Sequence, residues 1–262
     1  MEELCYAYSL RLQFSKPAWN HQFFLRAFPQ SDARQKLLEQ QIAISPHSFL
    51  AESRDSFGNL CFYGVTEPHH DQFTVQVQGR AQVGLVAGVP EPAPERWRMM
   101  GYPSPLTRPG PCLRQLAGLR PPERGERSPL ERSLQLMELV HGALSYQRWV
   151  TGIQTTAEEA LKLGAGVCQD FAQILLALCR MEGITARYVV GMLQGEGESH
   201  AWVEVLSEGC WYGLDPTNLL MVEHCHIKIS CGRDYGDCAM NRGVFLGGGL
   251  QSQQVQVSVL PA

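Results

Sequence analysis

The chain has 262 residues and a mass of 29.2 kDa, enough for one large domain or two modest ones with a sizeable core that needs no disulfides. Hydrophobic residues make up 44% and charged residues 18%, a composition typical of globular proteins rather than of disordered chains. The net charge of −4 gives no broad basic surface. Nucleic acids and anionic membranes are therefore not expected partners.

The sequence predicts a cytoplasmic protein with reduced thiols. Its longest clean apolar run, residues 174–179, is far shorter than the roughly 20 residues that a membrane-spanning helix needs. The first residues lack a basic stretch followed by an apolar one, so we expect no secretory signal. Nine cysteines form an odd number, and in this context they indicate free thiols rather than a disulfide framework.

Residues 1–88 are typical of an antiparallel β-rich unit. Tyr6–Phe14 and Phe73–Val77 are rich in aromatic and β-branched residues, and the second segment alternates polar with apolar. A turn-forming stretch at 55–59 precedes the short apolar segment 60–65. Good helix formers over 32–41 predict one helix here. We expect a sandwich-like N-terminal domain over 1–88.

A proline-rich stretch follows this unit. Ten of the sixteen prolines fall between Pro90 and Pro129. Each proline removes a backbone donor and fixes φ, which excludes a long helix or a central strand. The pattern predicts an irregular connector over 89–128.

Helices precede strands in the remaining residues, 129–262, which is typical of an α+β unit. Ser128-Pro129 is a capping pair for an amphipathic helix that runs to about Tyr146. A second helix is predicted from about Val167 to Met181. Strands are predicted over 184–193, 200–206, 210–215 and 253–259.

Cys168 stands where the second of these helices begins. Phe171 and Leu175 follow at helical spacing, so the thiol lies at the top of the core-facing stripe. The free N–H groups of a helix start, and any nearby imidazolium, favour the thiolate. Most cysteines are merely small buried hydrophobic residues, and Cys168 taken alone fits that interpretation as well.

His200 and Asp215 complete a pattern with Cys168. His200 lies in a predicted strand and shares one face with Trp202, while Asp215 ends the next strand because Pro216 blocks its continuation. If the two strands form a hairpin, Asp215 comes beside His200. A carboxylate there would orient the imidazole and favour its charged form. Singly they are a strand histidine and a turn residue; together with Cys168 they define nucleophile, base and orienting acid.

The spacing excludes an ordinary papain arrangement. His200 follows Cys168 by 32 residues and Asp215 follows it by 47. In papain-type sequences the histidine and asparagine lie about 130–150 residues beyond the cysteine.

These segments resemble a known family. The runs GVCQDFAQILLALCR, EGITARYVVG, SHAWVEV and GLDPTN are similar to the core of the bacterial transglutaminase-like superfamily, and HQFFLRAFPQ and DSFGN resemble the β-rich N-terminal region that precedes that core. The resemblance implies a papain-like core. It also implies that Cys168 is the nucleophile, His200 the general base and Asp215 the orienting carboxylate.

The similarity extends on both sides of these segments. It includes Tyr146, Thr151 and residues 155–157 upstream, and residues 226–227 and 232–235 downstream. Three features depart from the family pattern: residues 147–150 replace a Pro-Gly that is common there, 239–240 replace a common proline, and the connector is unusually rich in Pro and Arg. Because none touches the triad, they bear on the shape of the substrate groove.

Other polar residues favour structural interpretations. Asp170, in the first turn of its helix, is expected to cap that helix. A zinc site would draw on ligands near the end of the chain, but their spacing lacks a paired Cys-x-x-Cys or His-x-x-x-His pattern. We therefore expect neither metal nor cofactor. The zinc candidates are His224, Cys225, His226, Cys231 and Cys238.

The sequence thus predicts a cysteine-dependent acyl-transfer enzyme that hydrolyses peptide or protein amides through a thioester. The backbone N–H of Cys168 is the first candidate oxyanion donor. Two alternatives stay open: an amine-accepting transglutaminase, and a non-catalytic peptide-binding or assembly module, although no triad member is missing. Candidates for the second oxyanion donor or for substrate contact are Gln169, Tyr146, Trp149 and Trp202.

Overall fold

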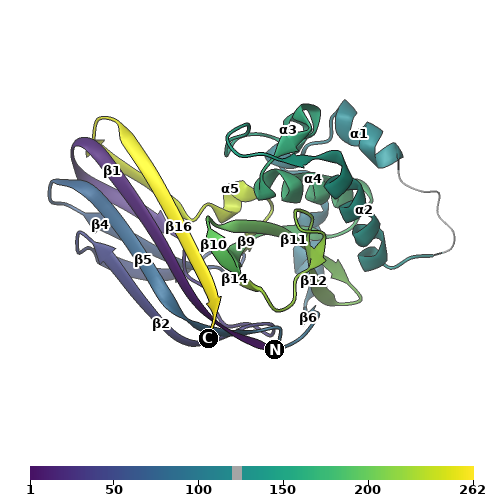
Figure 1. Ribbon diagram of the computed structural model, residues 1–262, viewed down its shortest axis with the longest axis horizontal. Coiled ribbons are helices and arrows are strands. Elements are labelled where there is room, and N and C mark those ends of the chain that lie inside the picture. Colours follow the sequence, from purple (N-terminus) through teal and green to yellow (C-terminus); the bar gives the residue numbers. More distant parts are fainter. Residues whose placement is uncertain (120–125) are drawn as a thin grey trace.

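The computed structural model describes residues 1–119 and 126–262. A unit of long strands lies beside a second unit in which helices cover a smaller sheet, and the two termini lie close together (Figure 1). Among the helices of the described residues, none has the length and apolar character required to cross a bilayer.

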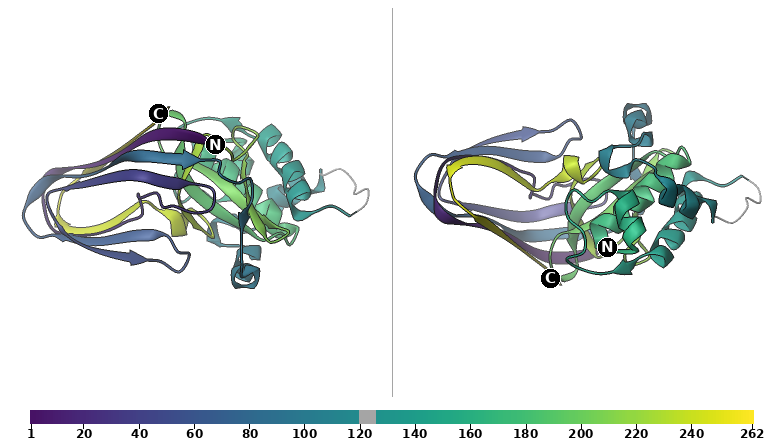
Figure 2. Two further views of the ribbon diagram at one scale, coloured as in Figure 1. Left: turned by 90° about the horizontal axis from the view of Figure 1, so that it is seen from below. Right: turned by 90° about the horizontal axis from the view of Figure 1, so that it is seen from above.

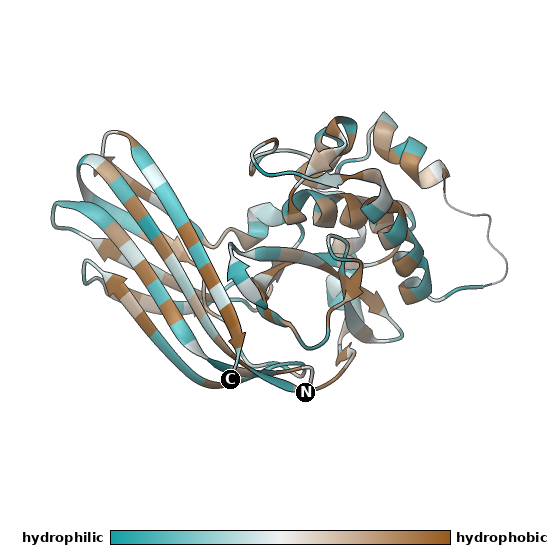
Figure 3. Cartoon of the chain, viewed as in Figure 1, coloured by the Kyte–Doolittle hydropathy of each residue, from teal (hydrophilic) through white to brown (hydrophobic). Residues whose placement is uncertain are grey.

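The first unit is one eight-stranded antiparallel sheet built around β1. Every second side chain of β1 is buried between Leu4 and Phe14, and the hydropathy alternates along the strands (Figure 3). The start of β1 pairs with β5 and β16, and its end pairs with β4 and β15. The sheet therefore curls over itself (Figure 2). Its strands are β1 (Glu2–Leu25), β2 (Lys36–Ser45), β3 (Phe49–Arg54), β4 (Leu60–Thr66), β5 (His70–Val83), β10 (Gly195–Gly197), β15 (Asn241–Gly247) and β16 (Gln251–Pro261).

Three expectations for this unit need correction. The helix predicted over 32–41 is wrong: strand β2 begins at Lys36 and pairs with β5, because sheet pairing overrides the helix propensity of these residues. The expected sandwich is a single curled sheet. The final strand exists, but it pairs with β1 (Tyr6 opposite Val259) and so belongs to the first sheet rather than to the second unit. Alternation predicts a strand without specifying its neighbour.

The second unit contains a smaller antiparallel sheet in the order β13-β12-β11-β9-β14, with β6 paired to β12. Helix α4 packs on β9 and β11 and is buried along most of its length. The strands are β6 (Val89–Pro90), β9 (Ala186–Leu193), β11 (His200–Ser207), β12 (Cys210–Asp215), β13 (Leu220–Met221) and β14 (His226–Gly232), and the helices are α2 (Pro129–Ala143), α3 (Ala157–Leu163), α4 (Cys168–Met181) and α5 (Tyr235–Cys238). Strands and helices together form the α+β architecture that the sequence predicts.

Local chemistry sets the bounds of α2. The Ser128 hydroxyl accepts a hydrogen bond from the Glu131 N–H, and the Glu131 carboxylate accepts one from the Ser128 N–H. Pro129 occupies the first turn. The helix ends at Ala143 rather than at the predicted Tyr146. It stops because β7 (Ser145–Tyr146) pairs in parallel with β8 (Ala165–Gly166).

The predicted connector is packed against the second unit where it is described; its residues 120–125 lie outside the described residues. It forms two short 3-10 helices (Pro94–Gly101 and Pro105–Thr107) and α1 (Pro111–Gly118). The buried Arg180 guanidinium donates to the Met100 carbonyl (2.9 Å) and to Thr107 Oγ1 (2.6 Å). This cation therefore holds the proline-rich stretch on α4.

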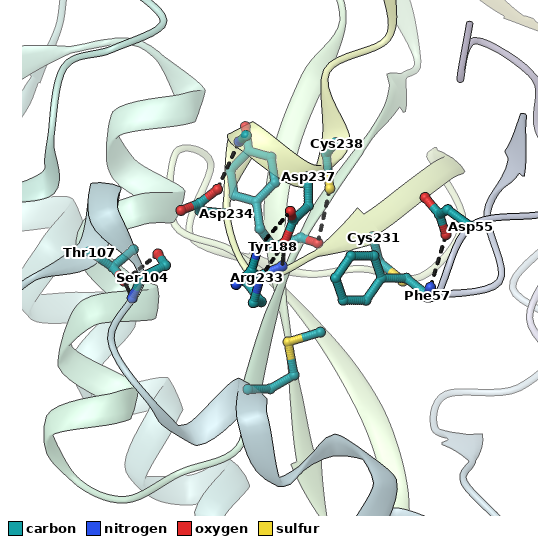
Figure 4. Close-up of polar contacts among 12 residues, drawn as sticks. Asp55, Phe57, Ser104, Thr107, Tyr188, Cys231, Arg233, Asp234, Asp237 and Cys238 are labelled. Atoms are coloured by element: carbon teal, nitrogen blue, oxygen red, sulfur yellow. Dashed lines mark hydrogen bonds and ion pairs between the residues drawn. The ribbon is translucent and has the colours of Figure 1, made fainter. Parts of the chain in front are cut away.

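The turn after β14 is held by its own side chains, although its residues belong to the family-like stretch 232–235. Arg233 pairs with Asp237 at 2.7 Å, and Asp234 accepts from the Gly236 N–H at 2.8 Å (Figure 4). Ser104 and Thr107 of the connector lie in the same view. The matched stretch 232–235 therefore forms a structural turn.

Candidate active site

Cys168 is the first residue of α4, as predicted, and it packs partly against the core. The preceding turn is fixed by Asp170, whose Oδ2 accepts from the Val167 N–H and from the Thr151 hydroxyl, both at 2.7 Å. Burial raises the pKa of Asp170. Asp170 thus caps its own helix, as the sequence indicated. A Cβ on Gly166 would lie 2.5 Å from this carboxylate, which leaves room for glycine alone.

The parallel β7–β8 pair brings a second segment beside Cys168. Tyr146 is opposite Gly166, and the Gln147 N–H donates to the Gly166 carbonyl at 2.8 Å. Tyr146 is 53% exposed and Trp149 is 90% exposed, the latter with a φ of +69°. Two of the predicted contact residues are therefore at the surface next to the thiol's helix.

His200 and Asp215 meet as the hairpin argument predicts. Strands β11 and β12 pair with Val203 opposite Leu214 and Ser207 opposite Cys210. His200 Nε2 lies 2.7 Å from Asp215 Oδ2, and the aspartate side chain is fully buried. An ionised carboxylate can only accept, so His200 donates through Nε2.

The Cys168 thiol lies beside the residue that precedes His200. Its sulfur is 3.9 Å from the Ser199 carbonyl oxygen, and its charge acts on the imidazole. Because Nε2 is committed to Asp215, Nδ1 is the nitrogen left for the sulfur. Burial lowers the pKa of His200, but the bonds and negative charges of Asp215 and Cys168 outweigh it and raise the pKa to about 10. The imidazole is therefore charged at neutral pH.

A second histidine reaches the same carboxylate. His226 Nε2, on β14, lies 3.1 Å from Asp215 Oδ2, and Asn218 Nδ2 donates to that oxygen at 2.8 Å. Burial disfavours a charged Asp215, yet the bonds from His200 and His226 hold its pKa well below the usual range. Burial lowers the pKa of His226, so this ring is neutral.

In the sequence, His226 is a zinc candidate and part of the family-like stretch, but nothing there predicts that it bonds Asp215. Alternation in β14 assigns His226 to a face of the sheet, but that strand reaches β12 only through β9 and β11. That order of strands is not visible in one sequence. Of the five zinc candidates, His226 lies within 4.8 Å of possible ligand atoms of His200 and Asp215. These same atoms are the hydrogen-bonding atoms of the cluster.

The remaining predicted residues differ in exposure. Trp202 shares the face of His200, as expected, but it is 1% exposed and its ring packs 6.3 Å from His200 and 5.2 Å from His226. It therefore forms the wall behind the histidines. Gln169 is half-buried in the first turn of α4.

The fold and the site together define an α+β protein whose Cys-His-Asp cluster stands at the start of a buried helix. Residues 120–216 match the transglutaminase-like superfamily, and residues 6–82 match the bacterial transglutaminase-like N-terminal region. The chain belongs to the transglutaminase-like superfamily, and it carries that N-terminal region.

Several individual proteins are similar to this chain. An uncharacterised protein of Mycobacterium tuberculosis is 30% identical over an alignment 271 residues long, gaps included. The alignment covers 89% of this chain and 84% of that protein. A Mycobacterium leprae protein is 36% identical over 126 residues, or 44% of this chain and 45% of its own. The crystal structure of a putative cysteine protease from Cytophaga hutchinsonii has a TM-score of 0.79 at 19% identity and covers 99% of this chain and 90% of its own.

Proposed function

We propose that this chain is a cysteine-dependent acyl-transfer enzyme that hydrolyses peptide or protein amides. The observation that carries the proposal is the 2.7 Å bond of His200 to the buried Asp215 carboxylate, next to Ser199, whose carbonyl oxygen lies 3.9 Å from the Cys168 sulfur. A nucleophile, a base and an orienting acid in hydrogen-bonding contact are the requirement for nucleophilic catalysis. A putative cysteine protease among proteins of the same fold agrees with hydrolysis.

The chemistry follows from the charges of these groups. With His200 protonated, Cys168 acts as thiolate and attacks the carbonyl carbon of the amide. The C–N bond breaks as the tetrahedral intermediate collapses, and His200 Nδ1 gives its proton to the departing amine. Water then attacks the thioester, transfers a proton to His200 and releases the acid, which restores the thiolate and imidazolium.

Asp215 keeps the imidazole in one orientation through the whole cycle. Its oxygens accept from His200, His226, Asn218 and the Thr217 N–H, so the carboxylate has no freedom to rotate. A fixed acceptor on Nε2 leaves Nδ1 to exchange the proton with sulfur and amine. His226 holds the same carboxylate oxygen that accepts from the catalytic imidazole.

The oxyanion of the intermediate requires at least one donor close to the sulfur. The backbone N–H of Cys168 is at the helix start, where N–H groups lack intrahelical partners. Gln169, half-buried in the same turn, is the proposed second donor, and the exposed Tyr146 and Trp149 are proposed to line the entrance. The cytoplasmic location stays a prediction.

The test is turnover of a panel of peptide amides, with and without an added primary amine. Cys168→Ala should lose about 10³-fold or more in kcat, while Cys112→Ala, which removes another partly exposed thiol, should match the native protein. Release of free acid supports hydrolysis, and capture of the added amine would instead indicate a transglutaminase. A Cys168→Ala variant that retains the native rate would overturn the proposal.

A further inference from the structure

A groove of about 670 Å³ separates the outer face of the first sheet from the loops of the second unit. Its floor is the exposed face of three neighbouring strands, β5, β1 and β16, where Ser9 is opposite both Gln76 and Gln256 and Ala7 is opposite both Gln78 and Ser258. Its walls are Arg148 and, on β10, Glu196 and Gly197. We call this hollow the sheet groove.

Both walls of the sheet groove are chain neighbours of the candidate active site. Arg148 follows Tyr146 by two residues, and the β7–β8 pair fixes Tyr146 beside the turn that leads to Cys168. The Tyr146 hydroxyl and, further away, the charges of Glu198 and Cys168 raise the pKa of Arg148. The other wall, β10, ends three residues before His200. The two segments that border the sheet groove are therefore the ones that continue along the chain to the turn before Cys168 and to His200.

The lining determines what kind of molecule fits. Glutamine side chains offer both donors and acceptors, and serine hydroxyls do the same, which matches the alternating N–H and C=O groups of an extended peptide. Arg148 and Glu196 carry opposite charges, so the walls favour neither a polyanion nor a polycation. The exposed apolar side chains are Ala7 on this floor and Leu260 in the adjoining hollow, so the surface is mainly polar.

The available length suits several residues. A second hollow of about 340 Å³ continues along the same face, shares Ala7, Gln78 and Ser258 with the first, and reaches Cys5 and Arg80. From Ser9 to Cys5 the strand advances four residues, or about 13 Å at the usual rise. About four residues of an extended chain fit over that distance.

We propose that the sheet groove binds an extended, polar segment of the acyl-donor polypeptide and so directs its scissile amide to Cys168. This inference rests on the proposed function and gives the N-terminal unit a role in substrate selection. It predicts that long polar peptides are better substrates than short amides that carry the same scissile bond.

The experiment blocks the groove and compares two substrates. One is a capped dipeptide anilide, and the other is the same compound extended on its acyl side by about six glutamine and serine residues. The measured quantity is the ratio of kcat/KM for the extended substrate to that for the short one. Ala7→Trp should reduce this ratio by about tenfold or more, because the indole fills the point that both hollows share.

A matched control lies on the same face outside both hollows. Gln254 is two residues from Gln256 along β16, and Gln254→Trp should leave the ratio unchanged. Ser258→Tyr repeats the block from a different strand, and thermal unfolding checks that each variant is folded. A native ratio near one, or a ratio that Ala7→Trp and Ser258→Tyr leave unchanged, overturns the proposal.

A direct binding measurement separates this proposal from the proposed function. Fluorescence anisotropy follows the labelled extended peptide with the Cys168→Ala protein and with the Cys168→Ala, Ala7→Trp double variant. Weaker binding by the double variant supports the sheet groove even if the native protein cleaves neither substrate, in which case the proposed function fails alone. Equal binding by both proteins contradicts the groove, whatever the catalytic result.

Discussion

The two sheets of this protein bury polar groups in different ways. In the first sheet, β1, β5 and β16 direct alternate apolar side chains inward, and the buried imidazoles of His21 and His70 stack among phenylalanines. In the second, charged side chains are buried in pairs, such as Arg187 with Glu204 and His200 with Asp215. A scaffold depends mainly on apolar burial, whereas a site needs side chains held in one geometry. Buried, fully bonded polar networks supply that rigidity.

The Arg187–Glu204 pair illustrates how the second sheet is fixed. Glu204 Oε2 lies 2.6 Å from Arg187 and 2.7 Å from Lys228 Nζ, and the Arg187 guanidinium stacks 4.0 Å from the Trp211 ring. Burial opposes the charge on Glu204, but Arg187 and Lys228 hold its pKa well below the usual range. The cluster joins β9, β11 and β14, and the last two of these strands carry His200 and His226.

The largest expected effect concerns the acid of the site. Asp215→Asn should reduce kcat by about 10³-fold or more, because an amide can no longer fix the orientation and charge of His200. It should also lower the pKa of His200 from about 10. In the native protein this raised pKa adds stability that is fully present below about pH 6.5 and lost as the pH rises through about 10.

Steady-state kinetics and a titration of unfolding against pH check both parts of this prediction. Asp71→Asn, at an exposed position of β5, is the control for an aspartate outside the site. Retention of most of the native kcat by Asp215→Asn would contradict the role given to the carboxylate.

The next effect compares two arginines directly. Arg187→Ala should reduce the free energy of unfolding by about 3–5 kcal/mol, since it removes one of the two cations that bond the buried Glu204 carboxylate. Arg80→Ala removes a guanidinium that is 46% exposed and pairs with Glu3 and Glu39 on the first sheet, and should cost less than about 1 kcal/mol. Urea unfolding measures both values. Similar losses of unfolding free energy in the two variants would contradict the proposed difference between the two sheets.

A smaller effect concerns the histidine pair of the first sheet. His21 Nδ1 lies 3.4 Å from His70 Nε2, and burial, with the neighbouring His70, lowers the pKa of His21 to about 4. Between about pH 6.5 and 4 the unfolded chain binds a proton at this position that the folded chain does not. Stability should therefore fall by about 3 kcal/mol as the pH decreases over that range.

Replacement of His21 by an aromatic residue that cannot be protonated tests this loss of stability. His21→Phe should flatten the acid limb of the stability curve, measured by urea unfolding from about pH 7 to 4. The comparison with the native protein removes contributions from other groups, His226 among them. An acid limb with unchanged slope would show that the stacked imidazoles do not limit stability.

The sequence predicts what depends on neighbours along the chain. Ser128 and Asp170 cap helices because a backbone N–H three residues away along the chain, that of Glu131 or of Val167, is within reach. Asp215 meets His200 because a short hairpin leaves little choice of register. The period-two pattern of β1 and β5 predicts their strands. These features required no knowledge of distant partners.

The features that sequence reasoning missed depend on distant partners. Residues 36–41 have helical propensity, but β5 offers them a sheet edge. The strand at 251–261 is far from β1 along the chain yet pairs with it along its length. His226 reaches Asp215 through an order of strands that one sequence does not encode locally.

The most direct test of the central claim is the rate of iodoacetamide labelling of each cysteine at about pH 6, mapped by mass spectrometry. If Cys168 forms an ion pair with His200, it should alkylate well ahead of the other partly exposed thiols, Cys5, Cys112, Cys210 and Cys225, and His200→Ala should remove that advantage. Labelling of Cys168 no faster than these thiols, or no effect of His200→Ala, would contradict the account.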